Sequence, residues 1–318
     1  MPDSDLAAAA EAAVRRLGVD AIDDVLVLCN QPQRAIAESL AVAGGRLARS
    51  IRVLEYEALT RDGEEPPAFV AKAMTEATVI LAPTTYSISH TQARIASTGR
   101  GARIATMPGI TPEMFARTVP VDYDGVERAG ARIAAELSAA STCRVTSPAG
   151  TDLVLSLEGR TAISDDGDLR AEAAWGNLPA GEAFIAPVEE IGDGSLVFDG
   201  ALAGYGRLRE PLLVTLVGGR AIGAEGEAAR WLLDTLDAGG PTGRVIAELG
   251  IGTNPQATLT GRILEDEKAV GTAHLAFGTS ASFGGTNVAK VHIDGILLQP
   301  TVELDGRLLI QDGALHVR

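Results

Sequence analysis

The sequence predicts an α/β N-terminal domain with a parallel sheet, followed by an α+β, mostly antiparallel domain. Three observations support this fold class. Short apolar runs alternate with helical patterns over residues 1–120. One long amphipathic pattern comes next, and the chain after it is rich in glycine and in short strand-like segments. Strands that alternate with helices are typical of parallel sheets, because each crossover returns the chain to the same end of the sheet.

Short apolar runs in the first half predict four strands, and the continuous run over residues 25–29 is typical of a strand that is buried on both faces. The runs are residues 25–29, 51–54, 78–82 and 102–106. Helical patterns separate them, over residues 6–17, from Pro32 to Gly44, and over residues 67–77 and 90–98. No phosphate-binding glycine pattern opens any of these helices, so a dinucleotide is not implied.

Residues 124–140 predict one long helix, with Val126, Ile133 and Leu137 on its apolar face. From Cys143 onward the segments are short and strand-like, and only residues 225–237 look helical. We place the domain boundary within the long helix or just after it. This gives an α/β domain over 1–140 and a metal-binding catalytic domain over 141–318.

Composition excludes several classes of partner. The net charge of −15 and the pI near 4.7 argue against nucleic acid, whose phosphates require a basic surface. No apolar run approaches the ~20 residues that span a bilayer, and the N-terminus lacks the pattern of a signal peptide. We therefore expect a cytoplasmic protein with no membrane partner. Cys29 and Cys143 lie in apolar segments and are predicted to be buried free thiols.

Glu182 follows a Pro-Ala-Gly turn and begins an otherwise apolar strand. It could be a strand-end residue that faces water. The alternative is a metal ligand on a rigid element, because the apolar neighbours predict burial and a buried carboxylate needs a cation or a donor network.

His292 and Asp294 are two residues apart in a strand-like segment. Residues i and i+2 of a strand point to the same face, so an imidazole and a carboxylate lie side by side there. This pairing forms one edge of the metal site in many hydrolases and oxygenases.

Other candidates have ordinary structural alternatives when each is taken singly. Glu248 could simply end a strand, and His274 could be a hydrogen-bonded core histidine. The acidic run over residues 265–267 favours a solvated helix face or turn.

Together, the candidates supply five oxygen and nitrogen ligands on apolar, glycine-flanked segments. They are Glu182, Glu248, His274, His292 and Asp294. The set suffices for two divalent cations, which would polarise a carbonyl and supply hydroxide near neutral pH. The sequence has no Gly-x-Ser-x-Gly motif and no signature that partners a cysteine with a histidine, so covalent catalysis has little support.

The second half resembles the aminopeptidase T family of metallo-aminopeptidases. The segments that carry the resemblance are Gly181–Pro187, Ala247-Glu248, the His-Leu-Ala-Phe-Gly motif at His274, and His292-Ile-Asp294. The resemblance implies a dinuclear centre of Zn, Co or Mn held by the five ligands. It also implies a homodimeric hydrolase that cleaves an amide or peptide bond of a small molecule or short peptide with a metal-activated water.

One departure from that family bears on the substrate. The family has a tyrosine seven residues beyond the motif histidine, where this chain has Ala281. We therefore expect a hydrolase of small amides with slow turnover of ordinary peptides, in which His90 orients the substrate or passes a proton.

The second half is also similar to the 2,5-dihydroxypyridine dioxygenases, which use one Fe(II). They end on the same His-x-Asp pair but have a histidine where this chain has Glu248. His90 resembles a pocket histidine of those enzymes, although it could also satisfy backbone groups at a helix start. A ring-cleaving dioxygenase is thus the alternative to the hydrolase. A non-catalytic descendant is the third possibility, and the five retained ligand types count against it.

Overall fold

The computed structural model describes residues 3–316, which form two units. The first comprises the chain up to Asp122 together with Gly167–Ala180, and the second comprises Tyr123–Asp166 and the chain from Gly181 onward. The division differs from the boundary expected near residue 140. The long helix α6 (Tyr123–Ala139) packs on strands of the second unit, and residues 167–180 return to the first unit to supply an edge strand.

The first unit is built on a parallel sheet in the order β2-β1-β3-β4-β8. Its strands are β1 (Asp24–Cys29), β2 (Ser50–Glu55), β3 (Val79–Thr84), β4 (Arg103–Pro108) and β8 (Trp175–Asn177). β3 is buried throughout and β1 from its second residue onward because both are central, whereas β2 lies at an edge and is largely exposed. The predicted parallel sheet is confirmed.

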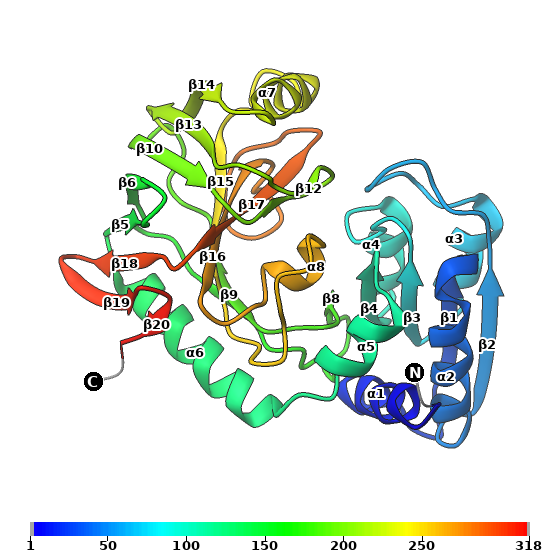
Figure 1. Ribbon diagram of the computed structural model, residues 1–318. Helices are drawn as coiled ribbons and strands as arrows, with labels where there is room; N and C mark the ends of the chain where they lie inside the picture. The colour runs from blue at the N-terminus through cyan, green and yellow to red at the C-terminus, as the bar shows by residue number, and fades with distance from the viewer. Residues whose placement is uncertain (1–2, 317–318) are drawn as a thin grey trace. The chain divides into compact units, whose positions relative to one another are not determined.

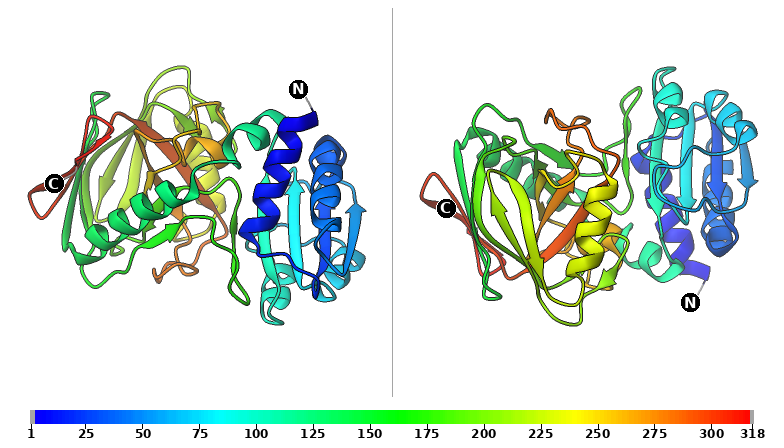
Figure 2. Two further views of the ribbon diagram at one scale, coloured as in Figure 1. Left: turned by 90° about the horizontal axis from the view of Figure 1, so that it is seen from below. Right: turned by 90° about the horizontal axis from the view of Figure 1, so that it is seen from above.

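Helices cover both faces of this sheet (Figure 2). They are α1 (Asp3–Arg16), the short turn η1 (Gln31–Gln33) with α2 (Arg34–Gly45), α3 (Ala68–Thr75), α4 (Gln92–Thr98) and α5 (Pro112–Thr118). Leu26, Leu28 and Ile80 pack against Val70 and Met74 of α3 on one face. The helix α5 was not predicted, although Thr111 caps it by accepting a hydrogen bond from the Met114 amide.

The second unit contains two antiparallel sheets, which confirms the expected fold class. One has the order β14-β13-β10-β6-β5-β18-β19-β20 and the other β12-β11-β17-β16-β15-β9-β7. The first of these sheets consists of β5 (Thr142–Thr146), β6 (Asp152–Ser156), β10 (Gly192–Phe198), β13 (Leu212–Val217), β14 (Arg220–Glu225), β18 (Thr301–Leu304), β19 (Arg307–Gln311) and β20 (Ala314–Leu315). The second consists of β7 (Ile163–Asp165), β9 (Glu182–Ile185), β11 (Ala201–Leu202), β12 (Gly206–Arg207), β15 (Ile246–Gly252), β16 (Thr272–Gly278) and β17 (His292–Leu298).

A single apolar cluster joins the two sheets. Leu155 and Phe198 come from one sheet, and Leu249, Leu275 and Phe277 from the other. The helix α7 (Ala229–Ala238) packs on β13 and β14, and the short helix α8 (Ile263–Asp266) precedes β16. The core side of the seven-stranded sheet is therefore apolar, and polar side chains are left to its other face.

The two cysteines and the helices were also the subject of predictions from the sequence. Cys29 and Cys143 are both buried and free, as predicted. Among the described residues, no helix combines the length and apolar character that a membrane span requires.

Candidate metal centre

The candidate ligands come from β17, β16, β15 and β9, four neighbouring strands of the seven-stranded sheet (Figure 1). They lie on one face of that sheet. The reason is strand alternation. Leu249 and Ile251 point into the apolar core, so Glu248 points to the opposite face. Likewise Leu275 points into the core and His274 does not. The hydrogen-bonded sheet thus fixes the positions of side chains that are far apart in the sequence.

Glu248, His292 and Asp294 form one compact group, which we call the His292 triad. His292 Nε2 lies 3.3 Å from Glu248 Oε2 and 3.3 Å from Asp294 Oδ1. The expected side-by-side placement of His292 and Asp294 is therefore confirmed. The backbone carbonyl of Thr279 lies 2.9 Å from His292 Nδ1 and can only accept, so Nδ1 carries a hydrogen. This fixes the ring with Nε2 toward the two carboxylates, the arrangement that is usual for a metal-binding histidine.

A second group combines Glu182, Glu267 and His274 with a buried lysine, and we call it the Lys268 cluster. Lys268 Nζ lies 2.7 Å from Glu182 Oε1 and 2.6 Å from Glu267 Oε1. Burial works against the charged form of Lys268, but the charges of Glu182 and Glu267 raise its pKa well above the ordinary value. The ammonium therefore stays protonated at neutral pH.

His274 connects the two groups. Its Nε2 lies 3.2 Å from Glu248 Oε1 and 3.4 Å from Glu182 Oε2. Burial disfavours the imidazolium, but the hydrogen bond to Glu248 and the charge of Glu182 raise the pKa of His274 to about 9. A protonated His274 thus lies between carboxylates of both groups.

Small residues in the neighbouring strands leave room for these side chains. Ala276 pairs with Glu248 on one side and with Asp294 on the other, so only a methyl group lies between the two carboxylates. Gly250 pairs directly with His274, and a Cβ added at Gly250 would lie 2.1 Å from Cε1 and Nε2 of that imidazole. The glycine is required because the imidazole packs against its backbone.

Aromatic edges border the His292 triad. The Phe283 ring meets the His292 ring at a centroid distance of 5.7 Å and an angle of 89°, and it meets Phe184 of β9 at 5.6 Å and 76°. The structure places the ring against the candidate ligand.

The loop that carries Phe283 is held by Glu189. Glu189 Oε1 accepts hydrogen bonds from the Thr286 amide at 2.5 Å and from Ser280 Oγ at 3.2 Å, and its other oxygen pairs with Arg160. Burial disfavours the Glu189 carboxylate, but the Thr286 amide and the Arg160 charge lower its pKa to about 2. Glu189 therefore remains ionised and fixes the loop.

The acidic run over residues 265–267 contradicts the expectation of a solvated face, because all three side chains are buried. Glu265 accepts a hydrogen bond from the Thr258 amide and Asp266 one from the Thr260 amide, both at 2.7 Å. Backbone donors and the ammonium of Lys268 satisfy the carboxylates, which is why burial is tolerated. In the sequence, the indication of this burial is Lys268, a counter-ion that directly follows the acidic run.

The five predicted ligands, Glu182, Glu248, His274, His292 and Asp294, all lie in the second unit within these two connected groups. Burial of Glu182 agrees with its interpretation as a residue on a rigid, apolar element. Their role in metal binding stays a prediction. His90 belongs to the first unit, where its ring meets Trp175 at 5.8 Å and 85°. Its catalytic role also stays a prediction.

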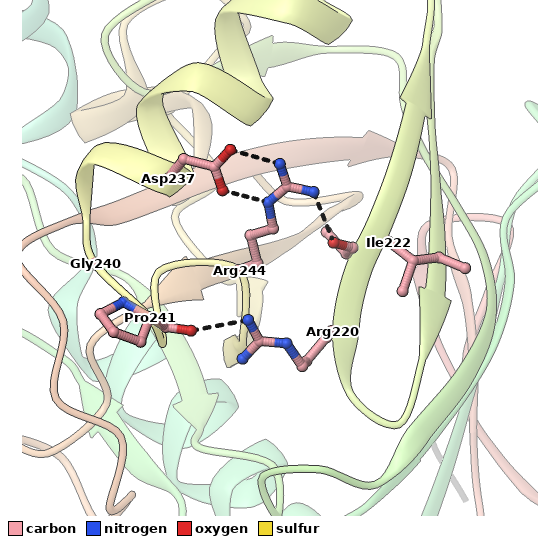
Figure 3. Close-up of a pocket in the computed structure, with 7 residues that line it drawn as sticks. Arg220, Ile222, Asp237, Gly240, Pro241 and Arg244 are labelled. Carbon is pink, nitrogen blue, oxygen red and sulfur yellow. Dashed lines mark hydrogen bonds and ion pairs between the residues drawn. The ribbon is translucent and has the colours of Figure 1, made fainter.

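A pocket of about 680 Å³ elsewhere in the second unit is lined by arginines instead (Figure 3). Arg244 donates to both oxygens of Asp237, at 2.5 and 2.6 Å. Arg220 donates to the carbonyl of Pro241 at 2.8 Å. These arginines connect α7, β14 and the loop that follows α7. The pocket includes none of the five predicted ligands.

Comparison with known proteins identifies relatives over the whole chain. A family model described as NicX, 2,5-dihydroxypyridine 5,6-dioxygenase, matches residues 3–317. The 2,5-dihydroxypyridine 5,6-dioxygenase of Pseudomonas putida KT2440 is 26% identical over 239 residues, which cover 71% of this chain and 67% of the relative.

Two solved structures share the fold. The 2,5-dihydroxypyridine dioxygenase from Pseudomonas putida KT2440 has a TM-score of 0.83 at 20% identity, over 100% of this chain and 99% of that chain. Wild-type AmpT from Thermus thermophilus has a TM-score of 0.76 at 21% identity, over 99% of each chain. The family model and the curated relative support the dioxygenase resemblance, and the aminopeptidase T resemblance is supported by the shared fold alone.

The expectation of a metallo-hydrolase of the aminopeptidase type is therefore wrong. The family model and the curated relative both bear the name of a ring-cleaving dioxygenase, and AmpT remains a neighbour in fold. The carboxylate-rich ligand set favoured a hydrolase, but such a set does not by itself distinguish a hydrolytic metal centre from an iron centre. What both interpretations share, an enzyme that uses a metal, is supported. The chain belongs to the 2,5-dihydroxypyridine 5,6-dioxygenase (NicX) family.

Proposed function

We propose that the protein is a dioxygenase that opens a dihydroxylated pyridine ring with one Fe(II) held by Glu248, His292 and Asp294. The observation that carries the proposal is the His292 triad itself, within a chain that belongs to the dioxygenase family over nearly its full length. The first substrate to test is 2,5-dihydroxypyridine, the compound named for the relatives.

The His292 triad fits a divalent metal by the chemistry of its donors. Two carboxylates face an imidazole nitrogen at 3.3 Å, and the opposite nitrogen of that ring is fixed by the Thr279 carbonyl. The ligand atoms of the triad lie within 4.8 Å of one another, and two buried carboxylates so close together require a shared positive charge. An imidazole with carboxylates is a donor set that suits divalent iron.

The set departs from the usual two histidines and one carboxylate of non-heme iron oxygenases, because Glu248 replaces one histidine. A second imidazole, that of His274, contacts the set through Glu248 at 3.2 Å. The additional carboxylate makes the set of ligands more anionic. We propose that the positive charge of protonated His274 compensates for this extra negative charge.

The surrounding residues suit a planar aromatic substrate. The Phe283 ring meets the His292 ring edge to face and also meets Phe184, and aromatic pairs favour such contacts. Glu189 and Arg160 keep the Phe283 loop in place. These residues would orient the ring and exclude water while the His292 triad holds the metal.

The reaction needs no external reductant. One carbon–carbon bond of the ring breaks and both atoms of dioxygen enter the product, so the ring loses four electrons and dioxygen gains four. An Fe(II) ion bound at the triad supplies the Lewis acidity and redox chemistry that this reaction requires.

Oxygen consumption tests the proposal. The protein is reconstituted anaerobically with Fe(II) and mixed with 2,5-dihydroxypyridine and dissolved oxygen. We expect one dioxygen consumed per ring, with loss of the aromatic absorbance, and no consumption by His292→Ala. Failure to consume oxygen with 2,5-dihydroxypyridine and with related dihydroxylated pyridines would contradict the proposal.

Two further predictions belong to this function. His90 would orient the substrate or pass a proton, so His90→Ala should lower kcat while the bound iron remains. A homodimer is also proposed, and sedimentation of the purified protein tests it.

A further inference from the structure

We infer that Lys268 is a built-in cation that takes the place of a second metal ion and limits the centre to one. The inference deepens the proposed function, since it concerns the metal content of the same site. It assigns a role to a buried lysine for which the sequence predicted none.

The Lys268 cluster and the His292 triad are alike in their ligands. Each offers three ligand atoms that lie within 4.8 Å of one another, from one imidazole and two carboxylates. They differ in their positive charge. The Lys268 cluster contains an ammonium within 2.7 Å of both its carboxylates, and the His292 triad contains no lysine or arginine partner in any ion pair among the described residues.

The ammonium and a divalent cation compete for the same oxygens. Lys268 Nζ contacts one oxygen each of Glu182 and Glu267, and it lies 3.8 Å from Asp165. A metal ion sharing Glu182 and Glu267 would lie close to the ammonium, and like charges at such distances repel strongly inside a protein. The protonated lysine therefore excludes the metal.

Lys268 is also held at this position by its backbone. Its amide donates to the Glu265 carbonyl at 2.9 Å, and its carbonyl accepts from the Asn254 amide at 2.8 Å. The next residue packs on β15, where a Cβ added at Gly252 would lie 2.1 Å from the Ala269 carbonyl oxygen. Lys268 is completely buried, so it cannot swing into solvent as a surface lysine does.

The cluster keeps ligand atoms that the lysine does not contact. Glu182 Oε2 and His274 Nδ1 are buried and form no hydrogen bond with any described residue, and Glu182 Oε2 lies 3.4 Å from His274 Nε2. Removal of the ammonium would leave Glu182, Glu267 and His274 as a buried set of two carboxylates and an imidazole. Such a set requires a cation, so we expect the variant without the lysine to bind a second metal ion.

The experiment counts metal ions in the full-length protein. Wild type, Lys268→Ala and the control Lys72→Ala are stripped with chelator, dialysed to equilibrium against Mn(II) and analysed for manganese per chain. Lys72 is an exposed lysine of α3 in the first unit, so its removal changes the charge equally without touching the site. We expect about one manganese per chain in wild type and Lys72→Ala, and about two in Lys268→Ala. The melting temperature of Lys268→Ala should rise more on Mn(II) addition than that of wild type.

A count of one in folded Lys268→Ala, or of two in wild type, would overturn the inference. Should Lys268→Ala not fold, Glu267→Gln provides the second test. It keeps the ammonium, so one manganese should remain, and a loss of metal would show that Glu267 is a ligand in the native protein. Oxygen uptake is measured separately. If wild type binds two manganese ions per chain but consumes oxygen after iron loading, the inference is wrong and the proposed function stands. If the manganese counts are as expected but the iron-loaded protein consumes no oxygen, only the proposed function is wrong.

Discussion

Replacement of Gly250 by alanine should disturb the centre through His274. An added Cβ would lie 2.1 Å from two atoms of the imidazole, whereas ordinary contacts begin near 3.4 Å. The ring must therefore retreat by about 1.3 Å, and the contact of 3.2 Å between His274 and Glu248 is lost. A charge-assisted hydrogen bond contributes about 1.5–3 kcal/mol, and overpacking a core costs about 1–3 kcal/mol. We expect the free energy of unfolding to fall by about 3 kcal/mol.

Urea unfolding of the metal-free protein measures this change, and Mn(II) titration measures its effect on binding. A loss of about 1.4 kcal/mol in binding free energy corresponds to a tenfold weaker affinity. We expect Gly250→Ala to weaken the affinity for Mn(II) by at least this factor. Gly223→Ala is the matched control, because an added Cβ there meets nothing within 4 Å. It should leave stability unchanged or raise it by up to about 1 kcal/mol.

A double-mutant cycle tests the cause directly. In the His274→Ala background the clashing ring is absent, so Gly250→Ala should cost almost nothing there. Equal costs in both backgrounds would refute the assignment of the clash to His274. Unchanged stability and metal affinity in the single variant Gly250→Ala would refute the reasoning altogether.

Four further variants test other parts of the centre. His292→Ala and Asp294→Ala should each abolish oxygen consumption and reduce bound metal to well below one per chain while the circular dichroism spectrum persists; full metal content would remove that residue from the triad. Glu189→Gln should destabilise the protein by about 2 kcal/mol at pH 7. Because the folded pKa of Glu189 lies at about 2, below its usual 4.5, this difference should shrink as pH falls from about 4.5 toward 2, and a pH-independent difference in denaturation midpoints would contradict it. Phe283→Ala should raise KM for an aromatic substrate about tenfold with a smaller change in kcat, and an unchanged KM would show that the ring does not border the substrate.

The ligands could be predicted from the sequence because strand alternation is local. Glu248 precedes the core residue Leu249, and His292 and Asp294 share a face by spacing alone. Lys268 could not be predicted in the same way. Its partner Glu182 is 86 residues distant. The two come together because Glu182 pairs with Gly252 of β15, and the nearby Asn254 amide donates to the Lys268 carbonyl. Charged residues in a run are usually solvated, and here tertiary pairing overrides that tendency.

The strand β8 was missed for a related reason. It has three residues, too few for a periodic pattern, and its partner strand β4 lies far earlier in the chain. Without β8, nothing in the sequence pattern indicates that the chain returns to the first unit. The boundary was therefore drawn once, near residue 140, although the chain passes between the units three times.

The return of the chain to the first unit at β8 affects how that unit folds during synthesis on the ribosome. The edge of β4 that will pair with β8 is complete at Pro108, but its partner begins only at Trp175. At typical elongation rates the interval is on the order of 10 s. During this time α6 and the strands β5, β6 and β7 of the other unit are made, while one edge of the parallel sheet has no partner. Exposed strand edges promote aggregation. The yield of native protein should therefore depend on how quickly residues 109–177 are translated.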